Sequence, residues 1–161
     1  MSSARTSAAP APRYSRATEG SGVAAAVRRR WPSAVGAAAA LASVALLIPL
    51  SEPVRAGVAA WSLLVAAVVY LTWGTARGDL GHRRWLAAQT ASVVAFGAIA
   101  LVTVAVDPAV GRFVLAAGWL GHAAWDVFHH RADRVVPRWY AESCMVIDVS
   151  VAALLLTVGF I

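Results

Sequence analysis

The residues best suited to chemistry lie in one short segment, GWLGHAAWDVFHH, at positions 118–130. It places His122, Asp126, His129 and His130 at one end of a hydrophobic stretch that is long enough to cross a bilayer. Ionisable side chains are costly in hydrocarbon, so they usually mark a functional site. At about 100° per residue, the four side chains lie within roughly a third of the circumference of a helix. The segment therefore predicts a polar face near one end of a membrane helix.

The next hydrophobic stretch brings a further carboxylate to the same depth. Cys144 and Asp148 are four residues apart and share one helical face. If the two stretches are antiparallel neighbours, His122 lies about 12 Å and Asp148 about 10 Å from the same membrane boundary. Trp119 extends the polar face as an aromatic wall. We therefore expect one ligand-binding pocket, formed by His122, Asp126, Asp148 and Trp119.

Three interpretations of this pocket are open. The first is a divalent metal site, because imidazole and carboxylate are normal ligands of zinc and non-haem iron; its predicted ligands are His122, Asp126, His129, His130 and Asp148. The second is a pocket for a proton or a small polar ligand, because histidine exchanges protons near neutral pH. The third is structural: the polar groups hydrogen-bond to one another and hold two helices together.

Composition places this segment in a membrane protein. The chain has 161 residues, of which 60% are hydrophobic and only 14% are charged, and its mean hydropathy is +0.67. A soluble domain of this size needs more polar surface. The single cysteine, Cys144, excludes an intrachain disulfide. The net charge of +6 fits a membrane protein, and we expect no nucleic-acid partner.

Five apolar stretches predict an all-α bundle of five transmembrane helices. They cover about 33–50, 54–73, 85–106, 110–128 and 144–161, and each is long enough to cross about 30 Å of hydrocarbon. Proline-containing turns at 51–53 and 107–108 separate neighbouring stretches. Residues 1–30 are predicted to form a disordered basic cytoplasmic tail, and residues 31–161 to form the transmembrane domain.

The arginines predict the orientation. Twelve of the fourteen basic residues, all of which are arginine, fall in the N-terminal tail, the second loop and the fourth loop. The positive-inside rule then places the N-terminus inside and the C-terminus outside, as in a multi-pass protein of a bacterial plasma membrane. These arginines predict contact with anionic headgroups at the cytoplasmic face.

The function predicted from these features is that of a small polytopic membrane protein. Its polar His/Asp pocket, in the cytoplasmic leaflet, would bind a divalent metal ion or a small polar ligand. One alternative is a membrane enzyme that acts on a lipid-like substrate, with His122 as acid, base or ligand. Another is a structural or accessory subunit without chemistry of its own. The small-residue spacing of Ala117 and Gly121 allows close contact with a second copy or another membrane protein.

Overall fold

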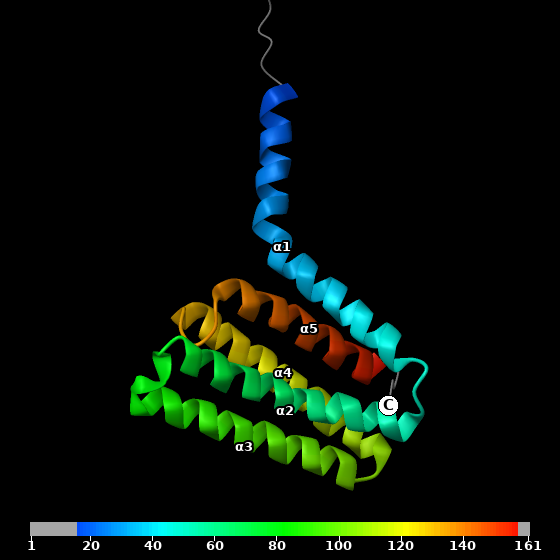
Figure 1. Cartoon of the computed structure of the whole chain (residues 1–161). Coiled ribbons are helices and arrows are strands. Elements are labelled where there is room, and N and C mark those ends of the chain that lie inside the picture. The colour runs from blue at the N-terminus through cyan, green and yellow to red at the C-terminus, as the bar shows by residue number, and fades with distance from the viewer. Residues whose placement is uncertain (1–15, 158–161) are drawn as a thin grey trace, which may run out of the picture. The chain divides into compact units, whose positions relative to one another are not determined.

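The described part of the chain, residues 16–157, is entirely helical apart from its turns in the computed structural model (Figure 1). In chain order the elements are α1 (Arg16–Leu47), α2 (Glu52–Ala76), the short 3-10 helix η1 (Asp79–Gly81), α3 (Arg83–Ala105), α4 (Pro108–Ala132) and α5 (Arg138–Thr157). The all-helical prediction is confirmed for these residues. Four of the helices contain a stretch that is long and apolar enough to cross a membrane: α1 between Arg28 and Leu47, and the whole of α2, α3 and α5.

Helix α4 differs from these four in its polarity. It is as long as α2, at 25 residues, but it carries Arg112, Asp126 and three histidines, which lower its hydropathy. The same helix packs against α5, α3 and α2. Its polar face is therefore covered by other helices, and the side chains of His122 and Asp126 are held inside the bundle.

Short turns with local caps separate these helices. The Asp107 side chain accepts a hydrogen bond of 2.9 Å from the backbone N–H of Ala109, and Pro108 follows at the first position of α4. An acidic cap and a proline at the first turn both favour helix initiation. Helix α2 likewise has Pro53 in its first turn, after Ser51. Turns are present beside both predicted positions, at 48–51 and 106–107, and the prolines themselves lie in the first turns of α2 and α4.

Several helices begin or end further out than hydropathy indicates, whereas α1 ends at Leu47, before the predicted position 50. Helix α1 begins at Arg16, within the segment predicted to be a tail, and residues 1–15 of that segment lie outside the described residues. Helix α5 begins at Arg138 rather than at 144, because a helix continues through polar residues once its hydrogen bonds are formed. Chain contacts divide the protein into two units, 1–31 and 32–161, and the site lies within the second.

A glycine lets α4 approach its neighbours closely. A Cβ atom on Gly118 would lie 2.7 Å from Leu63 Cδ2 in α2 and 2.8 Å from Ile99 Cγ2 in α3. Carbon atoms pack at about 3.5–4.0 Å, so no larger residue fits without displacing these side chains. The close approach of α4 to α2 and α3 depends on this contact.

The loop between α4 and α5 is held in a strained conformation. Val135 has φ +73°, a region that β-branched residues rarely adopt. Its N–H donates a 2.9 Å hydrogen bond to Asp79 Oδ2, and its side chain is fully buried. A Cβ on Gly74 would lie 3.0 Å from Val135 Cγ1. The loop therefore lies over the end of α2, where its backbone bonds to Asp79 and the Val135 side chain packs beside Gly74.

We predict that Gly118→Ala destabilises the bundle and that Gly121→Ala does not. The Gly118 methyl group would overlap Leu63 and Ile99, whereas the nearest atom to a Cβ on Gly121 is Phe96 Cε1 at 3.8 Å. Overpacking of this kind costs about 1–3 kcal/mol. Thermal unfolding in detergent measures both variants, and equal melting temperatures would contradict the packing described for α4.

A second prediction concerns the pH dependence of the loop. Burial acts to raise the pKa of Asp79, but the Val135 N–H and the guanidinium groups of Arg77 and Arg134 outweigh it, so the pKa is lowered. The ionised carboxylate therefore stabilises the fold above its unfolded-state pKa of about 4, and this contribution is lost as pH falls through the folded-state value. Asp79→Asn should lower the melting temperature at pH 7, and the deficit should shrink as the pH is lowered towards 3.

The control for this experiment is Asp133→Asn, which removes a more exposed carboxylate whose ion-pair partner among the described residues is Arg138, at 3.4 Å. It should change the melting temperature little at either pH. A deficit of Asp79→Asn that stays constant from pH 7 to pH 3 would show that the carboxylate charge does not stabilise the loop.

Candidate functional site

Helix α4 supplies two of the three side chains at the centre of the site. His122 and Asp126 are one helical turn apart and both are fully buried. His122 Nδ1 lies 3.4 Å from Asp126 Oδ1. Residues at i and i+4 face the same side of a helix, and this face of α4 is covered by the neighbouring helices.

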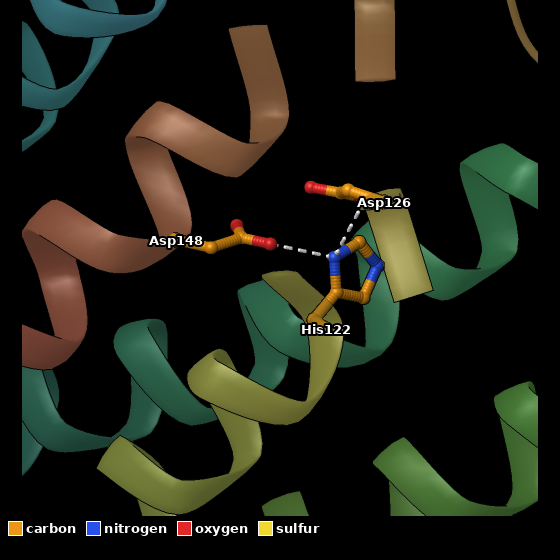
Figure 2. A group of neighbouring side chains, drawn as sticks. All are labelled: His122, Asp126 and Asp148. Atoms are coloured by element: carbon orange, nitrogen blue, oxygen red, sulfur yellow. Dashed lines mark hydrogen bonds and ion pairs between the residues drawn. The ribbon is translucent and has the colours of Figure 1, made fainter. Parts of the chain in front are cut away.

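Helix α5 supplies the third side chain. Asp148 is 2% exposed, and its Oδ2 lies 2.8 Å from His122 Nδ1. Figure 2 shows the three side chains pointing towards one another from α4 and α5. One potential ligand atom from each of His122, Asp126 and Asp148 lies within 4.8 Å of the other two. We call these three residues the His/Asp/Asp cluster, and the arrangement could hold a metal ion.

Tyr70 connects the cluster to α2. The hydroxyl group of Tyr70 donates a hydrogen bond of 2.6 Å to Asp126 Oδ1, and the side chain is fully buried. Its ring also meets the His122 ring edge-on, with 5.5 Å between centroids. Tyr70 was not among the site residues predicted from the sequence. The available signal was its position near the end of α2, at the depth expected for the cluster.

The His/Asp/Asp cluster contains more groups that can be negatively charged than groups that can be positively charged. It has two carboxylates and one imidazole, and among the described residues His122 is the only ion-pair partner of either aspartate. The arginines with ion pairs contact Asp79 and Asp133 near the helix ends instead. Burying a charge is costly unless it is paired, so the cluster requires a proton or a bound cation to balance its second carboxylate.

Two polar atoms of the cluster have no partner in the described part of the chain. They are Asp126 Oδ2 and His122 Nε2, and both are buried. The Asp126 and Asp148 carboxyl groups lie close enough to hydrogen-bond to each other when one of them carries a proton. Most buried polar atoms in proteins have a hydrogen-bond partner. The Asp126 oxygen is an acceptor and can bind a proton or a cation. The His122 nitrogen lies among aromatic rings, of which Phe96 is 5.0 Å away between centroids.

His129 belongs to a separate polar layer. Its Nδ1 lies 2.9 Å from the carbonyl oxygen of Trp125, so this nitrogen carries the proton and donates. Its Nε2 lies 2.9 Å from Gln89 Nε2 in α3 and accepts from that amide. Both ring nitrogens therefore have partners, and the residue is not part of the three-residue group. Gln89, like Tyr70, was not predicted as a site residue.

The two remaining predicted residues also lie outside the cluster. His130 is only partly buried and does not belong to the three-residue group. Trp119 is buried with α2 and α3 residues in the apolar core, and its ring centroid lies 6.4 Å from that of His122. The structure thus brings together His122, Asp126 and Asp148 from the predicted set, with Trp119 beside them.

Comparison with models of known protein families, with curated proteins and with solved structures found no match. The assignment of function therefore depends on the geometry of the cluster.

We predict that Tyr70→Phe destabilises the fold by about 1–3 kcal/mol, because Asp126 loses its hydroxyl donor and stays buried. The matched control is Tyr140→Phe, which removes a partly buried hydroxyl that bonds to the Cys144 thiol rather than to a carboxylate and should therefore cost less. Urea or thermal unfolding in detergent measures the difference. If Tyr70→Phe is as stable as the wild type, the hydrogen bond to Asp126 does not support the cluster.

Proposed function

We propose that this chain is a multi-pass membrane protein that binds a divalent transition-metal ion through His122, Asp126 and Asp148. The observation that carries the proposal is the convergence of three buried donor groups from two helices within 4.8 Å. Their two carboxylates share a single imidazole. A bound cation would supply the missing positive charge.

The donor set favours a particular class of ion. Magnesium and calcium prefer oxygen ligands, whereas imidazole with carboxylates suits zinc, manganese or iron. Metal–ligand distances of about 2.1 Å place the donor atoms of a tetrahedral site about 3.4 Å apart. His122 Nδ1 and Asp126 Oδ1 are already 3.4 Å apart. The 2.8 Å contact with Asp148 is a hydrogen bond, and it would have to lengthen if Nδ1 bound a metal, with the imidazole proton carried on Nε2 instead.

Burial favours an ion over a larger ligand. His122 and Asp126 are 0% exposed and Asp148 is 2% exposed, so a polar organic molecule would have to push the helices apart. Tyr70 would act from outside the ligand set by orienting Asp126 through its hydroxyl group. Such outer hydrogen bonds typically change metal affinity by about 10–100-fold when removed.

The proposal includes five membrane crossings, with the N-terminus inside and the C-terminus outside a bacterial plasma membrane. The turn between α3 and α4 is short, and α4 packs against both α3 and α5. With 25 residues, α4 spans about 37 Å, which is enough to return the chain across the bilayer. Its polar side chains are acceptable at that depth because other helices cover them.

Proton binding is the second candidate. The 2.8 Å bond between His122 Nδ1 and Asp148 Oδ2 holds the cluster together without a metal, and a single proton on the carboxylates would reduce the excess negative charge. We rank the enzyme alternative below both, because the free His122 Nε2 is enclosed by aromatic rings rather than directed at an open cavity.

Metal analysis of the purified full-length protein tests the proposal. After incubation with zinc or manganese and removal of unbound ion, we expect about one ion per chain. His122→Ala and Asp148→Asn should lose it, because each removes one of three ligands. The control is His130→Ala, which removes a histidine outside the cluster and should retain the ion.

Absence of bound metal from the wild type, or equal binding by the wild type and Asp148→Asn, would overturn the metal proposal. In the first case, uptake of protons on mixing with acid, lost in Asp148→Asn, would support the proton-binding candidate.

A further inference from the structure

Helix α3 has a shallow groove on one face, and none of the residues that line it belongs to the His/Asp/Asp cluster. Its volume is about 660 Å³. All of the lining residues belong to the first half of the helix: Arg83, Leu86, Ala87, Thr90, Ala91, Val94 and Ala95. We call this feature the α3 groove. Since α3 is long and apolar enough to cross a membrane, the groove lies along the path of a lipid chain.

The groove is charged at one end, at Arg83, and mostly apolar along the rest of its length. Arg83, Ala87, Ala91 and Ala95 are spaced four residues apart, so they form one row along the helix. The small side chains of the three alanines form the floor of the groove, and the larger side chains of Leu86 and Val94 lie beside it. From Arg83 to Ala95 the helix rises about 18 Å, which is comparable with the half-thickness of the hydrocarbon core.

Arg83 has no acidic partner among the described residues. Asp79 pairs with Arg77 and Arg134, and Asp133 pairs with Arg138. The Arg83 side chain is exposed at the first turn of α3. A guanidinium group in this position is well suited to bind a phosphate. The groove therefore combines an unpaired cation with an apolar hollow directly below it.

We propose that the α3 groove binds one anionic phospholipid, with its phosphate on Arg83 and an acyl chain along Ala87, Ala91 and Ala95. Charge favours a lipid over a second copy of the chain in the groove. Two copies in one membrane have the same orientation, so a two-fold contact between their α3 grooves brings one Arg83 to the depth of the other. Like charges at that distance repel, whereas an anionic headgroup neutralises the arginine.

The test is native mass spectrometry of the full-length protein released from detergent, titrated separately with phosphatidylglycerol and phosphatidylcholine of the same acyl chains. We expect tighter binding of one phosphatidylglycerol. Arg83→Gln should weaken it about fivefold, the usual effect of one basic residue near an anionic headgroup. Ala91→Leu should weaken both lipids by filling the groove.

Two matched controls separate the groove from general surface effects. Arg131→Gln removes an exposed arginine outside the groove, and Ala124→Leu enlarges an exposed alanine on α4. Neither should change the affinity of the one lipid bound in the groove, even though Arg131 is also predicted to lie near headgroups. Soluble glycerol phosphate at the same concentration should not displace the lipid, because it lacks the acyl chain.

Three results would overturn the proposal: equal affinity for the two lipids, no effect of Ala91→Leu, or equal effects of Arg83→Gln and Arg131→Gln. Dimers that disappear in Ala91→Leu would assign the groove to contact between copies instead. The lining residues are separate from the metal ligands, so the groove and the cluster can fail independently.

Discussion

The burial of two carboxylates beside one imidazole is the constraint on which the bundle depends. Asp126 and Asp148 come from different helices and meet at His122 Nδ1. Separating α4 from α5 would leave buried polar groups without partners, at a cost of several kcal/mol in hydrocarbon. The cluster therefore specifies how α4 and α5 face each other, while apolar contacts that surround it could be satisfied by several rotations of either helix.

The same constraint explains why the polar face of α4, the most polar of the long helices in the second unit, is covered by other helices. Without other helices around it, α4 would expose His122 and Asp126 to lipid. Gly118 permits the close approach that covers them on the α2 and α3 side. On the same side Tyr70, from α2, contributes the hydroxyl group that Asp126 accepts. The close packing at Gly118 and the burial of His122 and Asp126 therefore require the same position of α4.

The sequence was sufficient to predict the helices and part of the site. Apolar stretches predicted the helical elements, and the 100° period placed His122 and Asp126 on one face, with Asp148 at matching depth. The sequence was not sufficient to separate His129 from the cluster. Residue spacing gives the relative direction of side chains on one helix, but it does not show which residue of a neighbouring helix each side chain contacts. The pairing of His129 with Gln89 depends on how α3 and α4 pack, as does that of Tyr70 with Asp126.

The two buried histidines of α4 differ in how completely they are satisfied. Both nitrogens of His129 have hydrogen-bond partners, so this residue and Gln89 form a closed contact between α3 and α4. His122 has one nitrogen without a partner in the described residues, and Asp126 beside it has one free oxygen.

A purely structural polar contact is most stable when every member is satisfied. The Gln89 contact comes closer to that condition, although its Oε1 atom also lacks a partner. The His/Asp/Asp cluster departs from it further, because its unsatisfied carboxylate oxygen lies in a group with excess negative charge. A cation or proton would correct the charge of the cluster, whereas the neutral contact between His129 and Gln89 needs no such correction.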